Sequence, residues 1–167
     1  RAMIAYNLEP EIYSITGLQA FLKIAQHQNI SHYPIHIKLD TGMHRLGFEP
    51  HLISELCSLL KNNNFVKVKS VFSHLAASDD LQLDDFTKLQ FQRFDAMYSE
   101  LEKVLPSKPI RHILNTSGIF NYAEKQMEMV RLGIGLYGIG NSEQELKVLE
   151  NVSTLKTIIS QIREVSP

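Results

Sequence analysis

The fold is decided by one stretch of the sequence, which reads His36-Ile37-Lys38-Leu39-Asp40-Thr41-Gly42-Met43-His44-Arg45-Leu46-Gly47-Phe48. Apolar and polar side chains alternate from Ile35 to Leu39, which is typical of a β-strand. Gly42 and Gly47 follow, and glycine permits turns that residues with a Cβ resist. We therefore expect the chain between these glycines to curl back over the strand end and to present Arg45 there.

Strands and helices alternate along the rest of the chain. We expect strands at residues 11–14, 34–40, 66–76, 110–114 and 129–139. We expect helices at residues 17–28, 51–62 and 84–104, and a helical turn at 142–150. In 84–104, helical spacing predicts an inward face made of Phe86, Leu89, Phe94, Met97, Leu101 and Val104. This alternation indicates a parallel sheet with helical crossovers, either a β/α barrel or a doubly wound sheet.

Residues 153–165 alternate in the manner of an antiparallel strand. We therefore divide the chain into an α/β domain at 1–150 and the start of an all-β domain at 151–167. The chain opens at Arg1 without an initiating Met and closes at Pro167 directly after a strand-like stretch. From this we expect an excised piece of a longer protein.

Composition excludes several classes of protein. The 167 residues carry a formal net charge of -1 with scattered basic residues, so neither a nucleic acid nor an acidic surface is indicated as partner. No apolar run reaches the ~18 residues that span a bilayer, and no signal pattern opens the chain, which favours a cytoplasmic protein without membrane contact. The single cysteine, Cys57, lies among leucines and is expected to be a buried filler. No metal site is expected.

Polar residues gather where the expected strands end. Lys38 and Arg45 lie at the end of one strand, His74 at the end of the next, Asn115 and Thr116 at the end of the one after, and Arg131 and Gly133 lie in the last. Groups delivered from the same ends of parallel strands form a ring, as in a barrel active site. Ordinary roles remain open for most of them, such as an exposed edge lysine, a surface arginine, a core histidine or a helix cap. Arg131 is the least ordinary, because a cation flanked by Val130 and Leu132 needs a partner.

The sequence Gly133-Ile134-Gly135-Leu136-Tyr137-Gly138 matches the dinucleotide-binding pattern G-x-G-x-x-G. In that fold the glycines follow a strand and open a helix. Here the residues between the glycines are typical of a strand interior, so we expect no helix to begin at Gly135. The backbone N–H of Gly133 could still bind an anion.

Four of these stretches together resemble the alanine racemases, in the same order as in that family. Residues 36–48 resemble the family's lysine and arginine loop, and residues 72–79 (FSHLAASD) resemble its histidine strand. Residues 112–117 (HILNTS) are similar to its phosphate-binding turn, and residues 129–138 (MVRLGIGLYG) to its last barrel strand. Two positions depart from the family: Thr116 stands where Ser is usual, and Leu132 where Pro is usual.

The resemblance implies the cofactor pyridoxal 5'-phosphate, in the C-terminal portion (strands four to eight) of a TIM-type β/α barrel with the first strand of a β domain. Arg131 would donate to the pyridine nitrogen and, because arginine keeps its proton, leave the ring unprotonated. His74 would orient Arg131. Arg45 would contact cofactor and substrate, and Lys38, as N6-carboxylysine, would hold Arg45. The phosphate would be bound by Asn115, Thr116, Gly133 and Ile134.

The same resemblance identifies residues that this sequence lacks. The family's Schiff-base lysine lies in a Lys-Ala-x-x-Tyr-Gly context, which is absent here, and its second base is a tyrosine of the partner subunit's β domain. The implied parent is a homodimer that interconverts L- and D-alanine for peptidoglycan, with serine open as an alternative substrate, and these 167 residues alone are expected to be inactive. Another pyridoxal-phosphate barrel, such as an amino-acid decarboxylase or a pyridoxal-homeostasis protein, or a non-catalytic phosphate-binding barrel, also remains open. The upstream Lys-Ala-x-x-Tyr-Gly segment would discriminate enzyme from scaffold.

Overall fold

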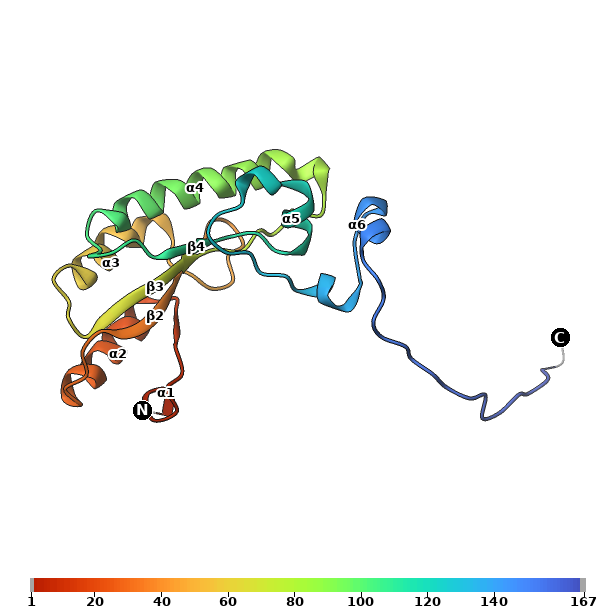
Figure 1. The fold of residues 1–167 in the computed structure, drawn as a ribbon, viewed down its shortest axis with the longest axis horizontal. Helices are drawn as coiled ribbons and strands as arrows, with labels where there is room; N and C mark the ends of the chain where they lie inside the picture. Colours follow the sequence, from red (N-terminus) through yellow and green to blue (C-terminus); the bar gives the residue numbers. More distant parts are fainter. Residues whose placement is uncertain (1, 166–167) are drawn as a thin grey trace.

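A four-stranded parallel sheet forms the centre of the protein in a computed structural model that describes residues 2–165. The strands are β1 (Glu11–Ile12), β2 (Tyr33–Lys38), β3 (Val66–Phe72) and β4 (Ile110–His112), and they lie side by side in chain order. Each neighbouring pair is parallel. The order β1-β2-β3-β4 is that of successive strands in an α/β sheet built from helical crossovers, as the alternating sequence predicts (Figure 1).

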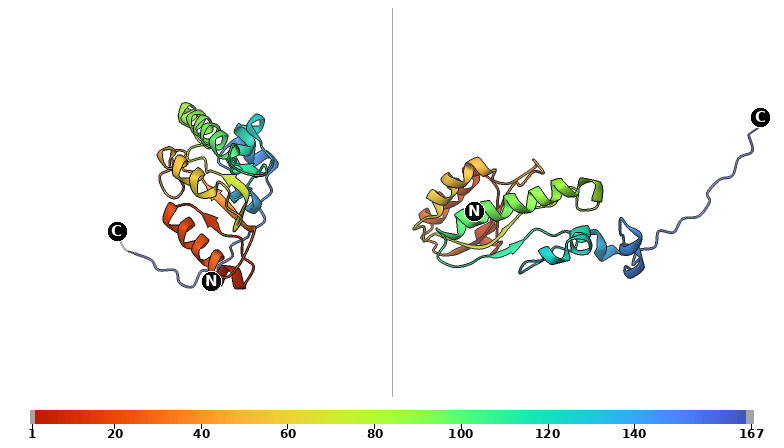
Figure 2. Two further views of the ribbon diagram at one scale, coloured as in Figure 1. Left: turned by 90° about the vertical axis from the view of Figure 1, so that its left-hand side faces the viewer. Right: turned by 90° about the horizontal axis from the view of Figure 1, so that it is seen from above.

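Three long helices cover one face of this sheet. They are α2 (Ile15–His27), α3 (Ile53–Leu60) and α4 (Asp84–Glu102), and each follows the strand before it (Figures 1 and 2). Shorter elements complete the described chain: α1 (Ala2–Ala5), α5 (Thr116–Asn121), α6 (Glu143–Val148) and the 3₁₀ helices η1 (Pro50–Leu52), η2 (Leu81–Leu83), η3 (Ala123–Lys125) and η4 (Ile134–Tyr137). None of the helices in the described residues is long and apolar enough to cross a bilayer.

The hydrophobic core lies between the helices and the covered face of the sheet. Alternate residues of β2 and its continuation, Ile35, Ile37 and Leu39, are fully buried there. In α4 the expected inward face is partly wrong, because Leu89 is exposed and Gln90 is fully buried instead. The buried face of α4 is therefore rotated relative to the expected one, and the polar side chain of Gln90 lies against the end of the sheet.

The loop after β2 curls back over the strand end, as its glycines predict. Gly42 and Gly47 have φ angles of 141° and 135°. A Cβ on Gly47 would lie 2.5 Å from the backbone nitrogen of Asp40, so this close return requires glycine. Phe48 then donates its N–H to the carbonyl of Lys38 and accepts from Asp40. The strand end is thereby capped by its own loop.

A β-bulge changes which side chains of β3 face the helices. Val68 pairs with Ile35, but His36 pairs with Ser70, so Lys69 is the extra residue. The bulge moves Ser70 and Phe72 to the face opposite the helices, in register with polar residues of β2. If side chains alternated uniformly along residues 66–76, Ser70 and Phe72 would lie on the same face as Val68, toward the helices.

Two expectations for the last third of the chain are wrong, and the strand expected at residues 153–165 stays a prediction. Residues 129–139 form no strand; only the N–H of Arg131 continues the ladder, by bonding the carbonyl of Leu114 at 3.0 Å. A helical turn, η4, does begin at Ile134, where we expected none. Residues 153–165 are extended and exposed without a strand partner in the described chain, and a strand is stable only when it is paired. The expected domains at 1–150 and 151–167 also include residues 1, 166 and 167, which lie outside the described residues.

Candidate active site

The face of the sheet opposite the helices is lined with polar and aromatic side chains. Register pairs place His36 beside Ser70, Lys38 beside Phe72, and Phe72 beside His112. The rings of Phe72 and His112 stack with centroids 4.7 Å apart and an angle of 8° between their planes. Three neighbouring strands therefore bring ionisable groups together around one aromatic ring.

The side chain of Arg131 lies over the ends of β3 and β4, half-buried and without a carboxylate partner in the described residues. Its Nη2 donates to the carbonyl of Ser73 at 2.6 Å, and its Nη1 lies 2.5 Å from Nδ1 of His112. Its guanidinium also lies 5.2 Å from the centre of the Phe72 ring, in cation–π contact. Within the described residues no acceptor bonds its Nε–H. Arg131 is thus a fixed cation with one donor left free.

His112 also belongs to the site, although the sequence shows it only as the first residue of the motif at residues 112–117. It is 4 % exposed, and burial together with the charge of Arg131 lowers its pKa from 6.5 to about 4. The imidazole is therefore neutral near pH 7 and can accept a hydrogen bond from Arg131. Its position directly before the expected ring of strand-end residues was the signal that could have identified it.

His74 lies where the sequence predicts it, at the end of β3 and next to Arg131. Its Nδ1 is 3.3 Å from Nη2 of Arg131. Burial and then the charge of Arg131 lower its pKa, so this histidine also favours its neutral form. The structure thus brings His74 and Arg131 together.

Lys38 and Arg45 are not brought together. Nζ of Lys38 lies 2.9 Å from Oε1 of Glu11 and 5.6 Å from the centre of the Phe72 ring. Arg45 is exposed on the loop after β2. The partner of Lys38 in the structure is Glu11, which no motif in the sequence marks as a site residue.

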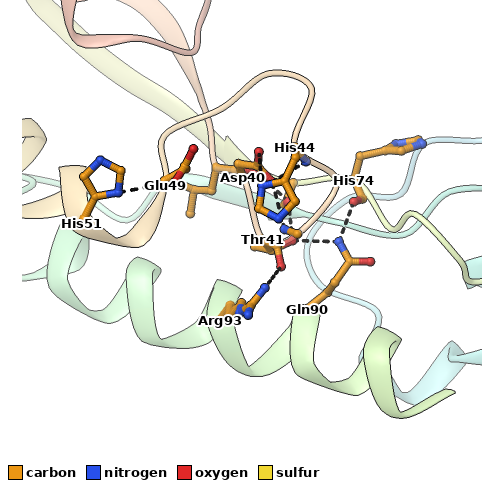
Figure 3. Close-up of polar contacts among 11 residues, drawn as sticks. Asp40, Thr41, His44, Glu49, His51, His74, Gln90 and Arg93 are labelled. Atoms are coloured by element: carbon orange, nitrogen blue, oxygen red, sulfur yellow. Dashed lines mark hydrogen bonds and ion pairs between the residues drawn. The ribbon is translucent and has the colours of Figure 1, made fainter. Parts of the chain in front are cut away.

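Helix α4 holds the base of this loop (Figure 3). The side-chain amide of Gln90 donates to the hydroxyl of Thr41 and to the carbonyl of His74, each at 3.0 Å, and its oxygen accepts from the N–H of Ala76. Arg93 donates to the carbonyl of Thr41 at 3.1 Å. The buried amide of Gln90 therefore ties together the chain segments that follow β2 and β3.

The expected phosphate-binding turn begins at the N-terminus of α5. Asn115 caps the helix by accepting from the N–H of Gly118. Oγ1 of Thr116 accepts from the N–H groups of Gly133 and Gly135 at 3.1 and 3.2 Å. The N–H of Ile134, the first residue of η4, has no acceptor within that helix.

A cavity of about 460 Å³ joins these groups. His74 and Arg131 line one part of it, and Thr116, Gly133 and Ile134 line another. A Cβ on Gly135 would lie 2.8 Å from Cγ2 of Thr116, so glycine permits this close packing beside the cavity. The cavity presents a cation at one place and free backbone and hydroxyl donors at another.

Cys57 lies outside this site, half-buried on α3 and packed against the hydrophobic core. Burial raises the pKa of its thiol, which disfavours the nucleophilic thiolate. This agrees with a structural cysteine.

Comparison with known proteins identifies the family of this chain. Residues 1–141 match the family described as "Alanine racemase, N-terminal domain". The alanine racemase of Clostridium tetani is 36% identical over 167 residues, which cover 97% of this chain and 42% of that protein. The chain therefore spans less than half the length of this curated relative.

Solved structures show the same fold. An alanine racemase of Clostridium difficile 630 superposes with a TM-score of 0.77 at 27% identity, covering 90% of this chain and 39% of that one. The alanine racemase of Bartonella henselae, solved with covalently bound pyridoxal phosphate, gives a TM-score of 0.71 at 24% identity and covers 84% of this chain and 39% of that one. The parallel sheet is thus part of an α/β barrel, and the chain belongs to the alanine racemase N-terminal domain family.

Proposed function

We propose that this chain is the cofactor-binding part of an alanine racemase that uses pyridoxal 5'-phosphate. The observation that carries the proposal is the position of Arg131, a half-buried cation with a free Nε–H in the same cavity as Thr116 and Ile134. A phosphorylated pyridine needs a donor for its ring nitrogen and a separate set of donors for its phosphate. The cavity offers both.

The donor set fits each end of that cofactor. Thr116 accepts two N–H groups, so its own hydroxyl proton is left to donate toward a phosphate. The N–H of Ile134 is a second donor, and Gly133 lies beside it. Asn115 contributes by fixing the turn, because its side-chain oxygen is already bonded to Gly118 and Ser78.

When bound, pyridoxal phosphate supplies an electron-accepting ring that acidifies the Cα proton of an amino acid. Arg131 would donate to the ring nitrogen and, as an arginine, keep its proton. The neutral rings of His74 and His112 would hold the guanidinium in place from two sides. We assign Arg45, exposed on the loop, to the substrate carboxylate and the cofactor's phenolic oxygen.

The role of Lys38 depends on Glu11. A carbamate on Nζ would place a negative charge within a few ångströms of the Glu11 carboxylate, whereas the ammonium form pairs with it at 2.9 Å. The carbamate at Lys38 stays a prediction, and it requires the Glu11 side chain to turn away.

We assign the chain to barrel strands four onward, residues 1–150 to the barrel and residues 151–167 to the start of a β domain. The parent would interconvert L- and D-alanine, supply D-alanine for peptidoglycan, and act as a homodimer in the cytoplasm. Support comes from the family match and from the exposed apolar residues between 152 and 165, which need a partner surface.

The cofactor assignment is tested by titrating this chain with pyridoxal 5'-phosphate and following the cofactor's absorbance. We expect saturable binding that Thr116→Val weakens about tenfold, the effect of one hydrogen bond to a charged group. Thr116→Ser keeps the hydroxyl and is the matched control. Equal affinity of all three proteins would overturn the assignment of Thr116.

These 167 residues are not expected to turn over alanine by themselves. No lysine here stands in a Lys-Ala-x-x-Tyr-Gly context. Incubation with the cofactor should give no internal aldimine, that is, no stoichiometric borohydride-reducible adduct at a single lysine, and no D-alanine should form. A borohydride-reducible absorbance band together with turnover would contradict this expectation.

A further inference from the structure

A continuous chain of hydrogen bonds crosses the open face of the sheet and ends at Arg131. Nη1 of Arg131 lies 2.5 Å from Nδ1 of His112, and Nε2 of His112 lies 3.1 Å from Oγ of Ser70. The same Oγ lies 2.6 Å from Nδ1 of His36, and Nε2 of His36 lies 2.9 Å from Oε2 of Glu9. Four hydrogen bonds therefore connect the candidate cofactor site to a carboxylate at the protein surface.

While both imidazole rings are neutral, the two ends of this chain determine the direction of every bond in it. A guanidinium can only donate, so Nδ1 of His112 must accept and the ring proton must lie on Nε2. That proton is donated to Ser70, whose hydroxyl is then free to donate to Nδ1 of His36. His36 in turn carries its proton on Nε2 and donates it to Glu9, and a carboxylate can only accept. No other arrangement of protons satisfies all four bonds while both rings are neutral.

The residues in the middle of this hydrogen-bond chain are buried, and the strand register holds them in line. Ser70 is 2 % exposed and His112 is 4 % exposed. The bulge at Lys69 brings Ser70 into register with His36, which it would otherwise miss. Nζ of Lys69 lies 2.7 Å from Oε1 of Glu9, and this bond lowers the pKa of Glu9, so the terminal group is a carboxylate near neutral pH.

We propose that Ser70, His36 and Glu9 are positioning residues, which hold His112 as its Nε2–H tautomer and through it fix Arg131. Without Ser70, the buried Nε2–H of His112 would lose its acceptor, and an unsatisfied buried donor is costly. The imidazole ring of His112 would then rotate or change its tautomer. Either change removes the acceptor at Nδ1 and releases Nη1 of Arg131. The inference rests on the proposed function only for the role of Arg131 toward a cofactor.

The test is NMR spectroscopy of the ring nitrogens in the chain labelled with ¹⁵N-histidine, without any cofactor. We expect both His36 and His112 to show the Nε2–H tautomer near pH 7. In Ser70→Ala we expect the Nδ1–H form of His112 to appear and the guanidinium protons of Arg131 to exchange with water roughly tenfold faster, the effect of losing one hydrogen bond.

Two variants control for an ordinary loss of packing. Ser70→Thr keeps the hydroxyl and should restore the wild-type tautomer and exchange rate. Thr87→Val removes a buried hydroxyl that has no hydrogen-bond partner in the described residues and lies outside the chain of bonds, so it should change neither.

Glu9→Ala tests the exposed end, where a folding defect is not expected. It should leave His36 as a mixture of tautomers. The inference is overturned if His112 carries its proton on Nδ1 in the wild type, or if both Ser70→Ala and Glu9→Ala leave the rings and Arg131 unchanged. Failure of cofactor binding with the expected tautomers intact would instead reject the proposed function and leave this inference standing.

Discussion

At the scale of single residues, the candidate site depends on keeping Arg131 charged, fixed and free of a carboxylate. Its neighbours are two histidines whose pKa values are lowered by burial and by Arg131 itself. They accept hydrogen bonds without adding charge. The guanidinium of Arg131 can therefore donate a hydrogen bond to a ring nitrogen, because no carboxylate of the described residues is bonded to it.

Lys38 gives the first prediction at this scale. Removing the Glu11 carboxylate removes the group that stabilises the ammonium form and repels a carbamate. We therefore expect Glu11→Gln to raise the occupancy of a carbamate on Lys38, seen as a bicarbonate-dependent ¹³C NMR signal. Glu9→Gln removes a carboxylate that does not contact Lys38 and should leave the signal at its wild-type size. The same signal in Glu11→Gln and in the wild type would contradict the prediction.

At the scale of elements, the site depends on how α4 and the segment after η3 are attached to the strand ends. Gln90 is fully buried in α4, and all three polar positions of its amide are bonded. Gln90→Leu would leave the N–H of Ala76 and the carbonyl of His74 without this partner. We expect a loss of about 2 kcal/mol in the free energy of unfolding, measured by urea denaturation.

The neighbouring Gln92 provides a matched control for that change. It is exposed on the same helix, so Gln92→Leu should alter stability by no more than about 0.5 kcal/mol. Equal effects of the two substitutions would show that the Gln90 amide does not anchor the loop.

Glu128 attaches the segment before Arg131 to β4. Its carboxylate lies 2.6 Å from Nη2 of Arg111 and also accepts the N–H of Arg111, and these bonds lower its pKa from 4.5 to about 2. The stabilisation is present above pH 4.5 and is lost as the pH falls toward 2. Because the carboxylate is about half exposed, solvent screening reduces it to roughly 1 kcal/mol.

Substitution measures the contribution of this ion pair directly. Glu128→Gln should lower the free energy of unfolding by roughly 1 kcal/mol at pH 7 and by nothing near pH 2. Glu124→Gln changes an exposed carboxylate nearby and serves as the control. A Glu128 effect that is equal at both pH values would rule out the ion pair as its cause.

The sequence predicts the regular elements well and the turns of the site only in part. Gly42 and Gly47 indicated the returning loop because few other residues adopt positive φ. The bulge at Lys69 and the rotation of α4 toward Gln90 left no local signal, since both depend on contacts between distant strands. Residues 129–139 looked like a strand from their apolar character, yet Thr116 draws the N–H groups of Gly133 and Gly135 into a turn.

At the scale of the whole molecule, the buried imidazole of His112 on the open face of the sheet makes the free energy of unfolding depend on pH. His112 takes up a proton near pH 6.5 in the unfolded chain but only near pH 4 in the folded one. Between these values the unfolded state binds more protons, so stability falls as the pH is lowered from 6.5 to 4. The full loss from this group is about 3 kcal/mol, at about 1.4 kcal/mol for each pKa unit.

Replacing the titrating ring separates this contribution from that of the carboxylates. His112→Gln should be less stable than the wild type at pH 7 and should lose less stability between pH 6.5 and 4, as followed by urea denaturation at each pH. His27→Gln, a change at an exposed histidine of α2, should keep the wild-type slope. Parallel curves for His112→Gln and the wild type would contradict a neutral buried His112.

The central claim is that Arg131 donates its free Nε–H to the ring nitrogen of pyridoxal 5'-phosphate, and the ¹⁵N resonance of Arg131 Nε reports on that contact. We expect this resonance to shift and saturate as the cofactor is added, and to stay in place when inorganic phosphate is added at the same concentrations. A resonance that does not move while the cofactor binds, or that moves equally with phosphate alone, would contradict the assignment and favour a phosphate-binding barrel.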